Sequence, residues 1–220
     1  MGLFRRLMRF FFHHFYHTFA WTYDFVADLV SIGRWKVWIQ SVIPYIQGMK
    51  VLEIGYGTGH LQHKLMVEKR STVGLDESIQ MGRLTKNRLV KAGFPIINLT
   101  RGRGEALPFA ADTFDTVVST FPTEYIFDAL TLSEVYRVLR SGGLLIALPA
   151  AWIVGQRFLD RGAAWLFKIT GQAPAFPHSV ISQRIKPSFE QVGFKPEFKT
   201  MEIKSSVILI VMASKPTGGI

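Results

Sequence analysis

The sequence predicts an α/β fold, a doubly wound and mostly parallel seven-stranded sheet with a C-terminal antiparallel hairpin, preceded by N-terminal amphipathic helices. From residue 48 onward, short apolar runs alternate with helical patterns, and this alternation favours parallel strands covered by helices on both faces. A glycine cluster follows the first apolar run, where a tight turn into a helix is expected. Near the end, two apolar runs are joined by Ser205-Ser206, a spacing that suits a hairpin better than a crossover.

The elements are expected in a regular order along the chain. Most of the apolar runs are continuous rather than alternating, as in strands that are buried on both faces. The expected strands are residues 50–54, 72–75, 96–99, 116–119, 144–148, 198–203 and 207–212. The expected helices are residues 58–69, 78–91 and 130–139. We therefore divide the chain into an N-terminal helical lead-in, residues 1–47, and one domain, residues 48–220.

The composition restricts the class of protein. The 220 residues include 26 Lys and Arg against 16 Asp and Glu, a formal charge of +10, and 48% of them are hydrophobic. A chain of this size and apolarity buries a sizeable core, which excludes intrinsic disorder. Because cysteine is absent, disulfide bonds, thiolate metal sites and a cysteine nucleophile are excluded, and a cytoplasmic protein fits best.

Neither a signal peptide nor a membrane-spanning helix is predicted. The N-terminal aromatic run is interrupted by His13, His14 and His17, and no small-residue cleavage site follows it. The longest stretch without a charged residue, residues 141–156, is too short to span a bilayer as a helix and contains Pro149.

Residues 3–22 have the pattern of a helix that lies on a membrane surface. On a helical wheel, their aromatic and aliphatic side chains form one broad arc and their three arginines lie on the opposite side. Rings settle at the headgroup level and arginine meets anionic phosphate, so the pattern predicts an anionic membrane surface as a partner and a peripheral position on the inner face of the membrane. The alternative is a lid that packs on the domain. His13 and His17 have metal-ligand spacing, but no third ligand is evident, so no metal is predicted.

The first expected strand runs into Gly55, Gly57 and Gly59, with the spacing G-x-G-x-G. Alternating glycines let the backbone turn tightly and approach a ligand, and the free amides of the next helix favour an anionic group. Asp76 ends the second expected strand, 21 residues after Gly55, where its carboxylate would accept both hydroxyls of a ribose. The alternative is that Asp76 caps the following helix at Ser78.

Four motifs in order resemble those of class I S-adenosylmethionine-dependent methyltransferases of the type 11 group, and the resemblance covers residues 20–213. The motifs are Val51 to Gly59, Gly74 to Ser78, Gly104 to Phe109 with Thr113 to Asp115, and Tyr136 to Gly143. The resemblance implies a Rossmann-like fold with S-adenosylmethionine as cofactor. It places the methionine part at the glycine turn, the ribose at Asp76, the adenine between residue 77 and segment 104–106, and the sulfonium beside residues 120 and 121. The implied cofactor-binding residues are Glu53, Gly55, Tyr56, Gly57, Gly59, Asp76, Glu77, Gly104, Glu105, Ala106, Thr120 and Phe121.

One position departs from the family pattern. Where relatives usually carry an Asp that accepts a hydrogen bond from the adenine amino group, this chain has Arg103. Arginine has no acceptor atom. Cofactor binding is therefore expected to be weaker or reorganised, and a degenerate, non-catalytic adaptor on the membrane is one alternative.

The segment before the domain indicates the acceptor. Residues 23–38 are similar to the lead-in of ubiquinone and menaquinone C-methyltransferases and, more loosely, to bacterial phospholipid N-methyltransferases. Both act on membrane lipids, so the expected acceptor is a hydrophobic or lipid-phase small molecule, either a quinone precursor or a phospholipid headgroup. The Arg-Asn pair of the quinone family is replaced by residues 121–125. This fold commonly shapes its acceptor site with the segment found here at residues 151–187, in which residues 154–169 have the pattern of a second basic amphipathic helix.

Methyl transfer from a sulfonium is an in-line displacement, for which a protein mainly aligns the reactants in a dry site. A base would still help, and Tyr23, Glu124 and Tyr125 are the candidate catalytic residues by location. A methyltransferase for RNA or for a soluble small molecule is the alternative. Nucleic acid is not the expected partner, because no Pro-Pro-aromatic motif follows the fourth expected strand. The glycine spacing disfavours a nicotinamide oxidoreductase.

Overall fold

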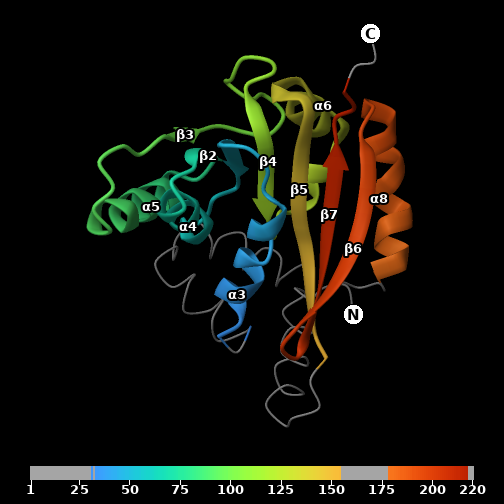
Figure 1. Ribbon diagram of the computed structural model, residues 1–220, viewed down its shortest axis with the longest axis horizontal. Helices are drawn as coiled ribbons and strands as arrows, with labels where there is room; N and C mark the ends of the chain where they lie inside the picture. Colours follow the sequence, from blue (N-terminus) through green and yellow to red (C-terminus); the bar gives the residue numbers. More distant parts are fainter. Residues whose placement is uncertain (1–30, 32, 155–177, 218–220) are drawn as a thin grey trace, which may run out of the picture.

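The computed structural model describes residues 31, 33–154 and 178–217, and its seven strands form one sheet (Figure 1). The strands are β1 (Lys50–Ile54), β2 (Ser71–Asp76), β3 (Leu99–Arg101), β4 (Phe114–Thr120), β5 (Leu139–Ile153), β6 (Lys195–Ile203) and β7 (Ser206–Ser214). Their order across the sheet is β3-β2-β1-β4-β5-β7-β6. Strands β1 to β5 are parallel, whereas β7 is antiparallel to both β5 and β6. The α/β fold with its terminal hairpin is thus confirmed.

The described helices lie on both faces of this sheet. They are α3 (Trp35–Gln40), α4 (His60–Val67), α5 (Ile79–Lys91), α6 (Ala129–Val138) and α8 (His178–Val192), with short 3-10 helices at Ile43–Tyr45 and Glu124–Phe127. In Figure 1, α4 and α5 lie at the β3 side of the sheet, and α8 runs beside β6 at the opposite side. No helix among the described residues is both long and apolar enough to cross a membrane.

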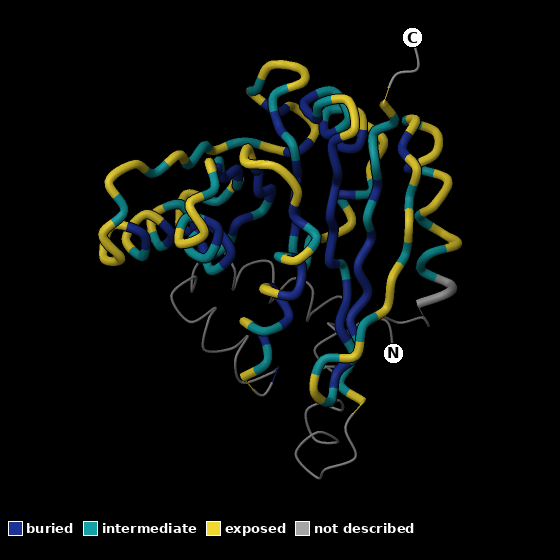
Figure 2. The backbone as a smooth tube through the Cα atoms, viewed as in Figure 1, coloured by how far each residue is buried: buried dark blue, intermediate teal, exposed yellow. Residues whose placement is uncertain are grey.

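Two apolar clusters fill the space between the sheet and its helices. Because side chains alternate along a strand, the neighbours Val117 and Val118 of β4 belong to different clusters. Helices α3 and α4 cover the face of Val118, and α6 and α8 cover the face of Val117. Figure 2 shows β5 and β7, at the centre of both clusters, buried along most of their length. The carboxyl ends of β1 to β4 therefore emerge from a rigid core along one edge.

Most strand boundaries differ somewhat from the sequence prediction, and three of the differences have a structural cause. The expected strand 96–99 is wrong, because Ile96 is 70% exposed and the paired strand is β3, which aligns with the end of β2. Strand β5 extends well beyond residues 144–148, since a shift in its pairing with β7 between Ala147 and Ala150 accommodates Pro149. The hairpin turn is Lys204-Ser205, because Ser206 already pairs as the first residue of β7.

Helix α8 was not predicted, and it takes up the end of the segment 151–187 expected to cover the acceptor site. That segment begins on β5, and its middle, with nearly all of the expected basic helix 154–169, lies outside the described residues. The amphipathic stretch 3–22 and Tyr23 also lie outside them.

Candidate functional site

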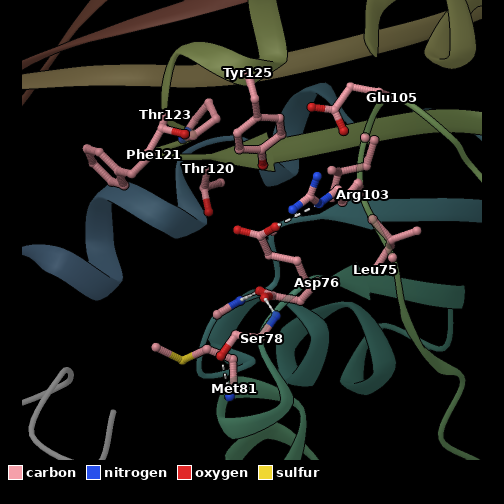
Figure 3. A pocket seen from close by; sticks show the side chains of 17 residues that line it. Leu75, Asp76, Ser78, Met81, Arg103, Glu105, Thr120, Phe121, Thr123 and Tyr125 are labelled. Atoms are coloured by element: carbon pink, nitrogen blue, oxygen red, sulfur yellow. Dashed lines mark hydrogen bonds and ion pairs between the residues drawn. The ribbon is translucent and has the colours of Figure 1, made fainter. Parts of the chain in front are cut away.

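A pocket opens at the carboxyl ends of the parallel strands (Figure 3). Each wall follows one strand: the glycine turn after β1, Asp76 to Ser78 after β2, Gly102 to Glu105 after β3 and Thr120 to Tyr125 after β4. In Figure 3, Thr120, Phe121 and Tyr125 approach the cavity from the side opposite to Asp76, Ser78 and Met81. The lining residues are Ile54, Gly55, Gly57, Leu75, Asp76, Glu77, Ser78, Met81, Gly102, Arg103, Gly104, Glu105, Thr120, Phe121, Pro122, Thr123 and Tyr125.

The glycine turn is shaped by close contacts on both sides. At Gly55 (φ +74°), a Cβ would lie 2.7 Å from the Tyr125 hydroxyl, so any side chain there would displace the tyrosine. At Gly59 (φ +79°), a Cβ would overlap Cγ2 of Thr85. The Thr85 hydroxyl donates to the Gly57 carbonyl (2.7 Å) and ties the turn to α5. The turn is thus held in one conformation by side chains from two other elements.

Asp76 is fixed by two backbone amides. The Gly57 and Ser78 amides donate to its two carboxylate oxygens, each at 2.9 Å. Burial raises the pKa of Asp76, and these two hydrogen bonds oppose that rise. The cap of α5 is Ser78, whose hydroxyl accepts from the Met81 amide (3.3 Å). Asp76 therefore supports the turn before α5 and also presents its carboxylate at the pocket.

Glu53 lies beneath the turn and does not line the pocket. Its side chain is 1% exposed, and its burial raises the pKa to about 8, an effect that a hydrogen bond from Gln62 only partly offsets. One carboxyl oxygen, Oε2, has no hydrogen-bond partner within the described residues. At neutral pH this carboxyl group is therefore mostly protonated.

The β4 side of the pocket is aromatic. Phe121 has a left-handed backbone conformation (φ +49°), and its ring stacks on Trp35 of α3 at 4.3 Å between centroids. Tyr125 is mostly buried, and its burial raises the pKa to about 12 despite a hydrogen bond to Ser119. Ser119 in turn donates to the carbonyl of Ile54 (2.7 Å). The tyrosine hydroxyl is therefore a protonated group held at the end of β1.

The structure gathers most, but not all, of the predicted site residues. Those that line the pocket are Gly55, Gly57, Asp76, Glu77, Gly104, Glu105, Thr120, Phe121 and Tyr125. Those that do not are Glu53, Tyr56, Gly59, Ala106 and Glu124. Tyr56 is buried against Met81, and Glu124 is exposed on its 3-10 helix.

Besides Arg103, which the sequence singles out only as a departure from the family pattern, the lining residues that sequence reasoning missed are Ile54, Leu75, Ser78, Met81, Gly102, Pro122 and Thr123. Each lies within five residues of a predicted one. Met81 could have been predicted from the sequence, because it lies in the first turn of α5, directly after the Ser78 cap, and that turn follows the end of β2.

Other motif residues hold the walls rather than the ligand space. Arg137 pairs with Glu134 through two nitrogens (2.7 and 2.8 Å) and donates to the carbonyls of Leu107 (3.0 Å) and Phe109 (2.7 Å). The Leu107 amide donates back to Glu134 (2.8 Å). This network fastens the loop after β3 to α6. Within the described parts of the chain, no three His, Asp or Glu side chains are grouped to hold a metal ion.

Comparisons with known proteins agree with this geometry. The ubiE/COQ5 methyltransferase family matches residues 7–173. A ubiquinone/menaquinone biosynthesis C-methyltransferase, UbiE of Allorhizobium ampelinum, is 33% identical over 190 residues, which are 76% of this chain and 71% of that protein. The UbiE protein of Blochmanniella floridana is 34% identical over 137 residues, 59% of this chain and 54% of that one. The matched segment thus spans only about half the length of some curated relatives.

Solved structures share the fold. A SAM-dependent methyltransferase from Thermotoga maritima superposes with a TM-score of 0.63 at 19% identity, and the match covers 92% of this chain and 98% of that one. The family match confirms the resemblance seen in the motifs and, with it, S-adenosylmethionine as the cofactor. The chain belongs to the ubiE/COQ5 methyltransferase family.

Proposed function

We propose that the protein transfers a methyl group from S-adenosylmethionine to a carbon atom of a lipid-phase quinone precursor. The observation that carries the proposal is the Asp76 carboxylate, held by the Gly57 and Ser78 amides at the wall of the pocket. A fixed carboxylate beside a glycine turn suits the two hydroxyls of a ribose, because it can accept a hydrogen bond from each hydroxyl without moving. The residues present therefore fit the cofactor.

In this proposal, each wall of the pocket binds a different part of the cofactor. Asp76 binds the ribose, the turn at Gly55 and Gly57 receives the methionine part, and Glu77 lies at the adenine end. Thr120 and Phe121 adjoin the sulfonium. The carboxylates at 76, 77 and 105 favour a cationic ligand, and the bound cofactor supplies the electrophilic methyl group.

Tyr125 is the proposed catalytic residue among the described candidates. With its pKa raised to about 12, its hydroxyl stays protonated at neutral pH, and its proton faces Ser119, whose own proton goes to Ile54. The lone pairs of the Tyr125 oxygen then accept a hydrogen bond that orients a hydroxyl of the acceptor, and the residue does not act as a base. Glu124 is exposed and lies outside the pocket lining, which weakens its candidacy, and Tyr23 lies outside the described residues. Tyr125→Phe is expected to lower turnover at least about tenfold while leaving cofactor affinity unchanged. Unchanged turnover would remove Tyr125 from the mechanism.

Two features favour a quinone precursor over the other expected acceptors. The named relatives methylate quinone precursors at carbon according to their names, and the Phe121 ring, stacked on the buried Trp35, provides an aromatic wall of the pocket next to the methyl position. A phospholipid headgroup would not need that wall. Residues 3–22 would bring the enzyme to the membrane in which a quinone precursor dissolves.

Calorimetric titration with S-adenosylmethionine tests the cofactor site. Asp76→Ala should weaken binding roughly ten- to a hundredfold, because it removes a charge-assisted contact to the ribose. Glu202→Ala, which removes an equal charge from the exposed edge strand β6, is the control and should bind like the wild type. Equal affinity in the Asp76 variant would reject the assignment.

Transfer of a labelled methyl group tests the acceptor. Incubation with a demethylated quinol, a phospholipid extract and total RNA should give label in the quinol alone. Label in the phospholipid or RNA fraction instead would replace the proposed acceptor.

Sedimentation with acidic vesicles tests the membrane contact of residues 3–22. Changing Arg5, Arg6 and Arg9 to Glu should abolish sedimentation, since each arginine contributes about 1 kcal/mol near an acidic surface. Wild-type protein that stays in the supernatant at low salt would refute the membrane contact.

A further inference from the structure

The ends of β2 and β3 bring two charged residues to the same rim of the pocket. The Gly102 amide donates to the Asp76 carbonyl (3.1 Å), which continues the strand pairing by one residue. Arg101 Nε donates to the carbonyl of Glu77 (3.0 Å). Glu77 and Arg103 therefore follow paired strands in parallel, and their positions beside each other are set by the sheet.

Their side chains meet at the pocket. Arg103 Nε lies 3.4 Å from Oε2 of Glu77, and Figure 3 shows the contact as a dashed line at the cavity. The two side chains are 75% and 63% exposed, so the pair adds little to folding stability. Of the lining residues that the structure describes, Arg103 alone is positively charged. An ion pair that contributes little to stability but lines a ligand pocket is more readily explained by a role in ligand binding.

Adenine requires an acceptor at this rim. Its exocyclic amino group at C6 is a hydrogen-bond donor, and a guanidinium has donors only. Beyond Asp76, the lining residues that offer a carboxylate are Glu77 and Glu105. Glu77 directly follows Asp76, so a nucleoside whose ribose binds Asp76 has its base within reach of this side chain. Glu77, unlike Glu105, forms an ion pair among the described residues, and this contact with Arg103 restricts the rotamers of Glu77.

We propose that Glu77 is the residue that recognises the adenine amino group, and that Arg103 positions its carboxylate. This inference rests on the proposed placement of the ribose at Asp76. One carboxylate oxygen accepts from Arg103, and the other accepts from the amino group at C6. Arg103 thus acts through Glu77 and neutralises its charge next to Asp76. The adenine is therefore selected by an ion pair in which Glu77 follows β2 and Arg103 follows β3.

The arrangement should discriminate between 6-amino and 6-oxo purines. A 6-oxo base presents an oxygen acceptor to the Glu77 carboxylate, so two acceptors face each other and the hydrogen bond is lost. In Glu77→Gln the amide can rotate to offer either its oxygen or its nitrogen, so the discrimination should fall. In Arg103→Gln the carboxylate remains but loses the partner that orients it.

Calorimetric titration with S-adenosylhomocysteine and its 6-oxo analogue, S-inosylhomocysteine, tests the proposal without turnover. The wild type should prefer the 6-amino ligand by at least about tenfold. Glu77→Gln should reduce that ratio to about threefold or less, and Arg103→Gln should give an intermediate ratio. Glu105→Gln is the matched control and should keep the wild-type ratio. Thermal melting of each variant checks that it is folded.

A wild-type ratio near one, or a ratio unchanged in Glu77→Gln, would overturn the proposal. A ratio that collapses in Glu105→Gln instead would assign the acceptor to Glu105 and also overturn it. Failure of the cofactor site itself has a different signature, because Asp76→Ala would then bind both ligands as tightly as the wild type does. The ratio of affinities reports on the base, and the affinity of the Asp76 variant reports on the ribose.

Discussion

The loop after β3 contacts two Arg-Glu pairs that differ in geometry and exposure. One pair lies on α6 and binds backbone atoms of the loop, and the other includes Arg103 of the loop itself. Arg137 and Glu134 join through two short contacts (2.7 and 2.8 Å), and the same guanidinium also donates to two loop carbonyls. Arg103 and Glu77 share one contact of 3.4 Å. The first pair is 38% and 23% exposed, the second 75% and 63%.

The difference shows how one loop is both fixed and available. Arg137 holds the pKa of the Glu134 carboxyl below its usual range and fills the hydrogen-bonding capacity of the segment 107–109. That end of the loop belongs to the core. At the other end, Arg103 and Glu77 keep their polar atoms in contact with the pocket, where a ligand can compete for them. Similar residue types serve folding in one place and recognition in the other, depending on burial and on the number of acceptors.

The largest expected effect is on folding, from Arg137→Ala. The substitution removes both Arg137 contacts to Glu134 and leaves the Phe109 carbonyl without its donor, whereas Glu134 keeps the Leu107 amide. The free energy of unfolding should therefore fall by about 2–3 kcal/mol. Urea denaturation monitored by circular dichroism measures this. Arg137→Lys should recover only a part, because lysine has no planar fork for the bidentate contact. A loss of less than about 0.5 kcal/mol would show that the pair resembles the exposed one.

An intermediate effect is expected at Glu53, a carboxyl group with no arginine at all. The folded protein keeps its proton up to about pH 8, while the unfolded chain loses it near pH 4.5. Its stabilising contribution is therefore complete below pH 4.5 and is lost as the pH rises through 8. Glu53→Gln should match the wild type at about pH 4, below the pKa of the unfolded chain, and be more stable by at least about 1 kcal/mol at about pH 9. Denaturation curves at the two pH values measure the difference, and parallel curves at both would contradict the burial argument.

The smallest expected effect is on the stability of Arg103→Ala. Because the Arg103–Glu77 contact is mostly exposed, the free energy of unfolding should change by less than about 0.5 kcal/mol. The same variant should lose part of its selectivity between 6-amino and 6-oxo ligands, which separates recognition from folding. A stability loss comparable to that of Arg137→Ala would make the second pair structural.

The predicted part of the site depended on strand ends. Once Gly55 and Asp76 were assigned to the ends of neighbouring parallel strands, their proximity followed from the sheet, and the structure places both at the pocket. Glu53 precedes the turn in the same motif but is buried beneath it, whereas its neighbour Ile54 lines the pocket. The motif does not encode which of the two adjacent residues faces the ligand. Glu124 and Tyr125 were equally plausible in sequence. A 3-10 helix turns only the tyrosine toward the pocket.

Helix α8 and the extension of β5 were missed for the same reason, which is a proline inside each element. Pro187 lies inside α8 and interrupts the pattern from which a helix would be predicted. Pro149 lies inside β5, where only the shift in pairing with β7 makes room for it. In both places tertiary contacts compensate for a local signal that ends the element. Strand β3 failed for the opposite reason: Ile96 is apolar but exposed, and pairing with β2 selected the more polar residues 99–101.

The strand order also constrains how the protein folds. Strand β7 lies between β5 and β6, so β6 is attached to the sheet only through a strand that follows it in the chain. Until β7 docks, β5 is a long, apolar edge with unpaired backbone groups along one side, the kind of edge that recruits other chains. A refolding chain passes through this exposed state, and its yield should fall as protein concentration rises. The antiparallel strand that completes the sheet is therefore also the element that protects the chain from aggregation.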